Sequence, residues 1–329
     1  MAYKFLMTAS TLGAAGQQLL IDAGCHVDYL TGSQDANEVE QKMAATAYDA
    51  VISRTVTLSE QAIAACPSLK VICKHGVGVT NIDVNAATQR GIPVLTTPAT
   101  NAQSVAELTI GLMLAASRHL HFFQHEILQN RWTRSSVGAE LYGKRLGLVG
   151  FGEIGQRVAH IAQAIGMTVN FFDPGLPDDA QHPNITRLQR FEDLLPVSDV
   201  LSLHCPVNHA TRKMLNQATL ARLPQQAVII NTSRGELIDE SALIAALRSG
   251  AVAAAGLDTF AVEPLPADHP FRTFKNLILT PHIGGSTQAA LDAVACSAAQ
   301  QCLTYLDQQT FFPRACVNPD FQKNKEFTL

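Results

Sequence analysis

The chain has 329 residues, 47% of them hydrophobic, and this length suggests about two domains with separate cores. Its formal net charge is -4, with 24 Lys and Arg against 28 Asp and Glu, so it lacks the basic excess that binding a nucleic acid backbone requires. No segment approaches the roughly 18 consecutive apolar residues of a membrane span, and the first residues lack the apolar stretch of a secretory signal. Neither nucleic acid nor a membrane is therefore expected as a partner.

The seven cysteines lie in apolar segments and form no CxxC pair. This usage indicates reduced, buried thiols rather than disulfides. We therefore expect a cytoplasmic protein, and no motif in the sequence predicts a bound metal.

Short β-rich segments alternate with Ala-rich helical segments, which is typical of parallel sheets covered by helices on both faces. The first strands are expected at residues 4–7, 50–53, 71–73 and 93–95. A long helix is expected over residues 102–120, and further strands follow at residues 146–149, 168–172, 200–203, 228–230, 252–256 and 277–279. A last long helix is expected from residue 287 to about residue 306.

The two long helices separate the two series of strands, and we interpret them as paired crossings between domains. The second series has the strands of a complete dinucleotide-binding sheet. The sequence therefore predicts an α/β protein with two doubly wound domains. The expected boundaries are residues 1–101 and 295–329 for a discontinuous substrate domain, and residues 102–294 for the inserted dinucleotide-binding domain.

A GxGxxG turn directly follows the strand expected at residues 146–149 and opens a helix. Gly150 permits the tight turn, Gly152 the close approach of a pyrophosphate, and Gly155 the packing of helix on strand. Asp173 ends the next strand, 18 residues beyond Gly155 (173 − 155), where an acid binds ribose hydroxyls. Because Asp173 would repel a 2′-phosphate and no Arg directly follows it, we expect NAD rather than NADP.

Arg234, Glu263 and His282 stand just after three successive strands of the predicted sheet, at the edge where such sheets bind ligands. Reducing a 2-keto acid needs a forked cation for the carboxylate, an acid that protonates the developing alkoxide, and a carboxylate that orients this acid. Arg, His and Glu supply these three functions. Each residue alone could equally be a helix cap, a solvated charge or a loop histidine, and only their joint placement favours catalysis.

The chain resembles the D-2-hydroxyacid dehydrogenase family, and most of all its phosphoglycerate dehydrogenase branch. The resemblance extends from about Ser53 to Asp320 through an ordered set of motifs, at residues 53–55, 76–83, 104–108, 150–155, 204–206, 231–235, 256–258 and 281–287. It implies a Rossmann NAD-binding domain inserted in a flavodoxin-like substrate domain. It also implies that Arg234 binds substrate, that His282 donates and accepts the proton, and that Glu263 supports His282.

The resemblance further implies two sets of binding residues. Contacts with NAD are expected at Gly150, Gly152, Glu153, Ile154, Gly155, Asp173, Cys205, Pro206, Thr211, Thr232, Ser233, Asp258, Gly284 and Gly285. Contacts with the substrate are expected at Ser53, Arg54, Lys74, Gly76, Val77, Gly78 and Arg134, where the loop of Gly76 would offer backbone N–H groups to the carboxylate. Ile52 stands where similar phosphoglycerate dehydrogenases carry an Arg for the phosphate, and Arg54 could substitute for it.

The function implied by the resemblance is NAD-dependent oxidation of a D-2-hydroxy acid by a homodimer, above all of 3-phosphoglycerate to 3-phosphohydroxypyruvate in serine biosynthesis. Two alternatives stay open: a hydroxypyruvate or glyoxylate reductase, and a non-catalytic protein similar to the C-terminal-binding-protein corepressors that uses NAD as a signal. The chain ends at Leu329 without the regulatory domain of some relatives, so no feedback control by serine is expected.

Overall fold

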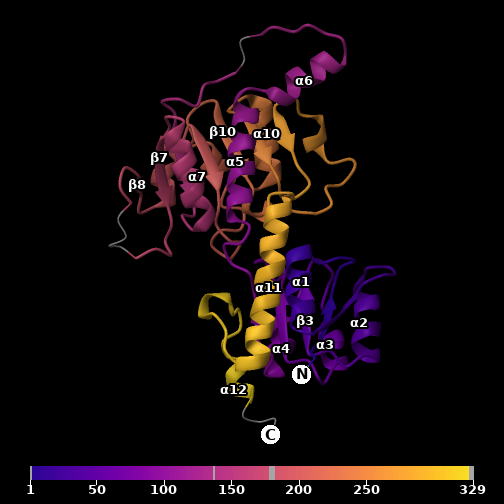
Figure 1. Cartoon of the computed structure of the whole chain (residues 1–329). Coiled ribbons are helices and arrows are strands. Elements are labelled where there is room, and N and C mark those ends of the chain that lie inside the picture. Colours follow the sequence, from indigo (N-terminus) through magenta and orange to yellow (C-terminus); the bar gives the residue numbers. More distant parts are fainter. Residues whose placement is uncertain (1, 136–137, 178–181, 326–329) are drawn as a thin grey trace. The chain divides into compact units, whose positions relative to one another are not determined.

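The computed structural model describes residues 2–135, 138–177 and 182–325 (Figure 1). The chain divides into two compact units, Met1–Asn101 with Thr287–Leu329, and Ala102–Ser286. Helix α11 (Gln288–Gln308) lies wholly in the first unit. The sequence analysis expected a boundary inside this helix, after residue 294, because an uninterrupted helical pattern contains no signal for where a domain ends.

The first unit contains a five-stranded parallel sheet in the order β2-β1-β3-β4-β5, which is the flavodoxin-like doubly wound order and confirms the expected fold class. Its strands are β1 (Lys4–Met7), β2 (His26–Tyr29), β3 (Ala50–Ser53), β4 (Val71–Lys74) and β5 (Val94–Leu95). The sequence analysis missed β2, because this edge strand is only partly buried and its polar residues interrupt the apolar pattern.

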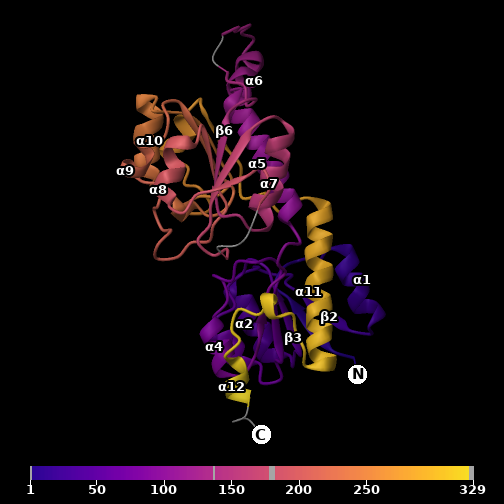
Figure 2. The same ribbon diagram turned by 90° about the vertical axis from the view of Figure 1, so that its left-hand side faces the viewer.

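Helices cover both faces of this sheet. On one face, α1 (Ala14–Asp22) lies beside α11, so closely that a Cβ added at Gly16 would stand 2.5 Å from the carbonyl carbon of Ala295 (Figures 1 and 2). The other face carries α2 (Ala36–Ala45), α3 (Glu60–Ala65) and α4 (Val84–Gln89). After α11 the chain forms the short helices η4 (Pro313–Ala315) and α12 (Phe321–Lys325), and an isolated antiparallel bridge joins Cys316 to Leu95 of β5.

The second unit contains a seven-stranded parallel sheet in the order β12-β11-β10-β9-β6-β7-β8. The strands are β6 (Arg145–Val149), β7 (Thr168–Phe172), β8 (Thr186–Arg187), β9 (Val200–Leu203), β10 (Ala227–Asn231), β11 (Val252–Leu257) and β12 (Leu277–Leu279). The chain reverses its direction across the sheet between β6 and β9, as in a Rossmann fold. The sequence analysis missed β8, a two-residue edge strand too short to give a periodic pattern.

Figure 2 shows the helices of the second unit on both sides of its sheet. The helices α5 (Ala102–Ser117) and α7 (Glu153–Ala164) cover one face, and α8 (Phe191–Leu194), α9 (Gln217–Leu220) and α10 (Glu240–Ser249) the other. The helix expected over residues 102–120 is α5, and a further helix that was not predicted, α6 (Leu120–Leu128), follows His119, whose backbone is left-handed (φ 50°). Short 3-10 turns complete the unit: η1 (Leu195–Val197), η2 (Gly235–Leu237) and η3 (Pro270–Thr273).

None of the described helices combines the length and apolar character needed to cross a membrane.

Candidate functional site

The turn after β6 is built so that only glycine fits at two of its positions. Gly150 has φ +94°, and a Cβ added there would lie 2.6 Å from the carbonyl oxygen of His204. A Cβ added at Gly155 would lie 2.5 Å from the carbonyl oxygen of Gly150. Gly152 differs, because the space around its missing Cβ is open and no side chain caps the N-terminus of α7. The first N–H groups of this twelve-residue helix have no side-chain acceptor among the residues that the structure describes, which suits an anion such as a pyrophosphate.

Asp173 follows β7 and lies against the same turn. Its carboxylate accepts hydrogen bonds from the backbone N–H of Phe151 and of Gly175, both at 2.8 Å. The loop that begins at Asp173 is held by Arg187, whose guanidinium donates to the carbonyl oxygens of Asp173, Leu176 and Pro177. The acid expected to bind the ribose is thus fixed beside the glycine turn, and the part played by Arg187 was not foreseen from sequence.

Other residues expected to contact the cofactor line the loops after β9 and β10. Ser233 donates from Oγ to the carbonyl oxygen of Cys205 at 2.7 Å, and Thr211 donates from Oγ1 to that of Pro206 at 2.7 Å. Burial raises the pKa of the Cys205 thiol to about 11, so this thiol is protonated and is no nucleophile. Thr232 is buried, with its hydroxyl 2.8 Å from that of Thr109. The remaining members of this set are the half-buried Ile154 and Gly285, and Glu153, which pairs with Arg157 at 2.7 Å.

Asp258 connects the loop after β11 to the loop after β12. It is 1% exposed and accepts three hydrogen bonds, from Thr280 Oγ1 (2.6 Å) and from the backbone N–H of Ile283 (2.9 Å) and Gly284 (2.8 Å). Its own backbone N–H donates to the carbonyl oxygen of Asn231, the last residue of β10, at 2.9 Å. One buried carboxylate therefore fixes the residues on either side of His282 relative to the neighbouring strands.

His282 and Glu263 form a direct pair at this edge of the sheet. Nδ1 of His282 lies 2.8 Å from Oε2 of Glu263, and the other oxygen of Glu263 accepts the backbone N–H of Phe260 at 3.0 Å. Both side chains remain accessible, with 48% of His282 and 35% of Glu263 exposed. Because the carboxylate accepts from Nδ1, the second ring nitrogen, Nε2, is left to exchange a proton with a ligand.

Arg234 lies in the loop after β10, which packs against the loop of Glu263. A Cβ added at the next residue, Gly235, would stand 1.9 Å from the carbonyl carbon of Phe260, so the two backbones are in contact. The side chain of Asn231 shapes the loop by donating to the carbonyl oxygen of Arg234 at 2.8 Å. The guanidinium donates to the carbonyl oxygen of Ser233 at 2.6 Å, and it has no carboxylate partner in the described part of the chain. It is therefore available to an anionic ligand.

In the first unit, the Gly76 loop follows β4. Gly76 has φ +130°, and its N–H is already bonded to the carbonyl oxygen of Lys74 (2.9 Å) and to Thr97 Oγ1 (3.0 Å). The N–H groups of Val77 and Gly78, in contrast, meet no acceptor among the residues that the structure describes. Of the three donors expected from sequence, two remain for a carboxylate.

The polar residues at the ends of β3 and β4 bond mainly to each other. Lys74 is 8% exposed, and its ammonium donates to the carbonyl oxygen of Arg54 and to Oδ1 of Asn81. The amide of Asn81 in turn donates to Ser53 Oγ at 3.1 Å, and Ser53 is fully buried. Lys74 and Ser53 are thus engaged inside the unit, while the partly exposed guanidinium of Arg54 has no partner among residues 2–135, 138–177 and 182–325.

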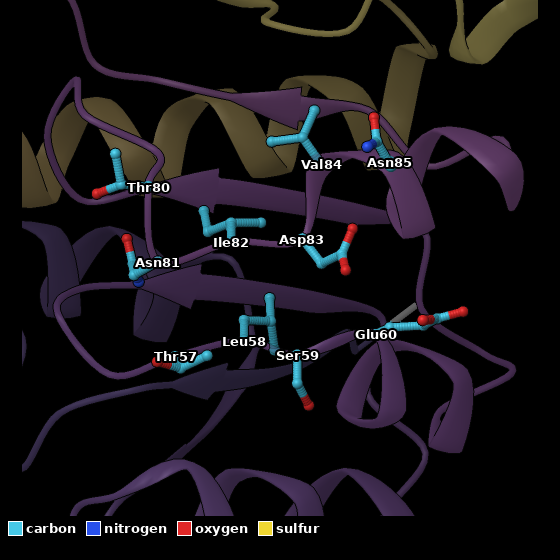
Figure 3. A pocket seen from close by; sticks show the side chains of 10 residues that line it. All are labelled: Thr57, Leu58, Ser59, Glu60, Thr80, Asn81, Ile82, Asp83, Val84 and Asn85. Carbon is cyan, nitrogen blue, oxygen red and sulfur yellow. The ribbon is translucent and has the colours of Figure 1, made fainter. Parts of the chain in front are cut away.

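Asn81 also lines an open depression in the first unit (Figure 3). The depression lies between the loops that precede α3 and α4, and its walls are Thr57, Leu58, Ser59, Glu60, Thr80, Asn81, Ile82, Asp83, Val84 and Asn85. None of the residues expected to bind the substrate borders it. Arg134, the last of that expected set, is exposed on the second unit.

Comparison with known proteins now defines the family. Residues 110–284, more than half of the chain, match the family model described as D-isomer specific 2-hydroxyacid dehydrogenase, NAD binding domain. The chain belongs to the D-isomer specific 2-hydroxyacid dehydrogenase family. The second unit of this dehydrogenase family member accordingly contains its NAD-binding domain, and NAD is the cofactor.

Relatives of this family member carry two kinds of name. The D-3-phosphoglycerate dehydrogenase of Methanocaldococcus jannaschii is 38% identical over 296 residues, which cover 86% of this chain and 56% of that protein. The hydroxypyruvate reductase of Thermotoga maritima is 42% identical over 247 residues, which cover 74% of this chain and 79% of that protein. The chain thus spans little more than half the length of the first of these relatives.

Solved structures agree with this membership over nearly the whole chain. The NAD-bound 3-phosphoglycerate dehydrogenase of Entamoeba histolytica is similar with a TM-score of 0.81 at 28% identity, covering 97% of this chain and 99% of that one. The glyoxylate reductase of Paecilomyes thermophila is similar with a TM-score of 0.85 at 28% identity, covering 96% and 98%.

The sequence analysis missed two groups close to the expected site residues of this dehydrogenase family member. His75 follows Lys74, and burial together with the positive charge of Arg54 lowers the pKa of its imidazole to about 4. Glu240 and His269 form a pair behind the loop of Glu263. No sequence motif marks either group, since each depends on contacts between segments far apart in the chain.

Proposed function

We propose that this chain oxidises a D-2-hydroxy acid to the 2-keto acid with NAD as hydride acceptor, and that its substrate is 3-phosphoglycerate. The single observation that carries the proposal is the 2.8 Å hydrogen bond between His282 and Glu263 at the carboxyl edge of an NAD-binding sheet. An imidazole oriented in this way is suited to move a proton on and off a substrate oxygen.

His282 is the proposed acid and base. Glu263 accepts the hydrogen on Nδ1, so the lone pair of Nε2 takes the proton of the substrate hydroxyl during oxidation. The imidazolium that forms is stabilised by the adjacent carboxylate. In the reverse direction the same nitrogen returns the proton to the oxygen of the 2-keto acid.

Arg234 is proposed to bind the carboxylate of the substrate. A guanidinium offers two parallel N–H donors, which match the two oxygens of a carboxylate and fix the orientation of C2. Support comes from the absence of a competing acid beside Arg234 in the described chain and from the packing of its loop on that of Glu263.

The residues proposed to hold the cofactor begin with the N–H groups of the Gly150 turn, for the pyrophosphate, and Asp173, for the adenosine ribose. When bound, NAD accepts the hydride that leaves C2 of the hydroxy acid. The other cofactor contacts are proposed at Gly152, Glu153, Ile154, Gly155, Cys205, Pro206, Thr211, Thr232, Ser233, Asp258, Gly284 and Gly285.

The choice of 3-phosphoglycerate is supported by the names of several relatives and by the unpaired guanidinium of Arg54, a candidate phosphate contact. Ser53, Lys74, Gly76, Val77, Gly78 and Arg134 remain the other predicted substrate contacts. A second candidate activity is reduction of hydroxypyruvate, which is favoured by the 42% identity to a hydroxypyruvate reductase and by Ile52 in place of a phosphate-binding Arg.

The deciding experiment is a substrate panel followed by nicotinamide absorbance. The pure chain is given NAD with D-3-phosphoglycerate or D-glycerate, and NADH with hydroxypyruvate or glyoxylate. The proposal expects kcat/KM to be highest for the phosphorylated acid and expects Arg54→Ala to remove most of that advantage. A preference for hydroxypyruvate that Arg54→Ala leaves unchanged would select the second activity, and no turnover with any acid would reject both.

We also propose that the chain is a cytoplasmic homodimer. Support for the dimer comes from α6 and the segment after it. Large apolar side chains are exposed there at Leu120 (53%), Ile127 (54%), Leu128 (69%) and Trp132 (82%). Light scattering of the wild type and of Leu128→Lys checks this assembly, and a monomeric wild type would contradict it.

A further inference from the structure

A glutamate behind the loop of Glu263 joins two segments of the second unit. Glu240 is the first residue of α10, directly after the N-cap Asp239. Its Oε1 accepts the backbone N–H of Ala261 at 3.1 Å, and its Oε2 lies 3.3 Å from Nε2 of His269. Only 21% of the Glu240 side chain and 17% of the His269 side chain are exposed. The carboxylate of Glu240 and the ring of His269 therefore contact each other and the protein backbone more than solvent.

The two ring nitrogens of His269 contact two different segments. Nδ1 accepts the backbone N–H of Phe271 at 3.3 Å, so Nδ1 must present its lone pair. Nε2, on the far side of the ring, lies 3.3 Å from Oε2 of Glu240. The ring is also packed edge-on against Phe271, with centroids 4.6 Å apart. His269 therefore contacts Glu240 and the backbone of Phe271 in a single ring orientation.

The segment that Glu240 holds is the one that supplies Glu263. The N–H groups of the consecutive residues Phe260 and Ala261 donate to Glu263 and Glu240 respectively. On its other side, the same segment touches the backbone of Gly235, next to Arg234. Phe260 and Ala261 are thus fixed between the loop of Arg234 and the N-terminus of α10, and their position sets where Glu263 meets His282.

We propose that Glu240 and His269 are positioning residues for the reaction, because they hold the loop of Glu263 at the place from which its carboxylate orients His282. This inference rests on the proposed function of the His282–Glu263 pair. No hydrogen bond or ion pair joins either residue to that pair in the described part of the chain, so their effect is expected to reach Glu263 through the segment of Phe260 and Ala261.

A double-mutant cycle on the full-length protein tests this route. Glu240→Ala is expected to lower kcat with D-3-phosphoglycerate about 10- to 100-fold, as misplaced catalytic groups do, and to leave the KM for NAD within about twofold. Glu240→Gln keeps an acceptor for Ala261 but no second acceptor for His269, and its kcat should fall between those of Glu240→Ala and the wild type. In a Glu263→Gln background, Glu240→Ala should add little further loss.

A matched control distinguishes positioning from general damage. Glu192 also lies in the first turn of a helix of this unit, where it pairs with Arg190, so Glu192→Ala should keep wild-type kcat. Losses that multiply in the double variant, or a Glu240→Ala enzyme with wild-type kcat, would overturn the inference. A loss of kcat matched by an equal rise in the KM for NAD would also overturn it, because that pattern indicates a deformed domain.

Amide hydrogen exchange provides a second readout that needs no turnover. Glu240→Ala should accelerate exchange at Phe260 and Ala261 and leave β10 and β11 protected. If the wild type oxidises no hydroxy acid but this change is seen, the proposed function fails while the loop contact stands. Unchanged exchange at both amides would refute the positioning role, whatever the activity.

Discussion

The loops after β10, β11 and β12 in the second unit and the loops after β3 and β4 in the first unit use polar residues in different ways. In the second unit, hydrogen bonds from Asp258 and Glu263 hold the backbone and the ring of His282, while Nε2 of His282 and the guanidinium of Arg234 stay accessible. In the first unit, Lys74 and Ser53 bond within the unit, and the accessible groups are backbone N–H donors and Arg54. A polar residue in a family motif can therefore support the loops, as the buried Asp258, Lys74 and Ser53 do, or remain accessible to a ligand.

The largest effect is expected at His282, the accessible member of the second unit's pair. His282→Gln should lower kcat about 10²- to 10⁴-fold, the usual contribution of a general acid or base. Its melting temperature should stay close to that of the wild type, because the side chain is about half exposed. Steady-state kinetics and thermal melting on the same sample check this. A marked loss of stability would show that His282 has a structural role in holding the loop instead.

Arg234→Lys should have the next largest effect. Lysine keeps the charge but not the forked geometry, and a hydrogen bond to a charged group contributes about 1.5–3 kcal/mol, so kcat/KM should fall about 10- to 100-fold. The measurement is kcat/KM for the hydroxy acid alongside the KM for NAD, which should not change. An unchanged kcat/KM would show that Arg234 does not contact the substrate.

Substitutions of two neighbouring basic residues, Lys74 and Arg54, test the first unit. Lys74→Met should destabilise the protein by about 1–3 kcal/mol, because it leaves partly buried oxygens of Arg54 and Asn81 without this donor. Arg54→Met should change stability by less than about 0.5 kcal/mol, as surface substitutions usually do, and raise the KM for a phosphorylated substrate. Denaturation and KM are measured on both variants. A stability loss in Arg54→Met together with a raised KM in a stable Lys74→Met would contradict the comparison.

The smallest effect concerns two histidines, one in each unit. Burial lowers the pKa of His204 to about 4, and burial and then Arg54 lower that of His75 to about 4. The folded protein keeps both neutral, whereas the unfolded chain binds protons below a pH of about 6.5, so stability is lost as pH falls from about 6.5 to about 4. His75→Gln and His204→Gln should each reduce this loss, by on the order of 1 kcal/mol.

The exposed His160 provides the control for this acid sensitivity. His160→Gln should leave the pH dependence of the unfolding free energy unchanged between pH 4 and pH 7. If all three variants behave like the wild type, the acid sensitivity of the protein comes from groups other than the buried imidazoles.

The sequence predicted best what local chemistry dictates. The glycine turn was recognisable because it directly joins a strand to a helix; the contact that requires Gly155 lies within this unit, while the one that requires Gly150 is with His204. The parallel α/β organisation was recognisable because buried strands read as apolar runs. The His282–Glu263 pair was predicted because both residues follow neighbouring strands, whose carboxyl ends lie at one edge of the sheet.

The sequence could not predict features that depend on distant contacts or on short edge segments. The edge strands β2 and β8 have too few buried residues for a clear pattern. The break at His119 is a single left-handed residue within an apolar helical run. The internal bonding of Lys74 to Asn81, and of Glu240 to His269, follows from the way loops pack, and no residue spacing encodes it.

The most direct test follows the hydrogen at C2 of the substrate. The wild type is incubated with NAD and D-3-phosphoglycerate carrying deuterium at C2, and the reduced nicotinamide and the solvent are then analysed by mass spectrometry and NMR. The account predicts that the deuterium is found in the nicotinamide ring and that His282→Gln slows this transfer about 10²- to 10⁴-fold while still binding NAD. Deuterium released to water, or transfer at the wild-type rate in His282→Gln, would contradict it.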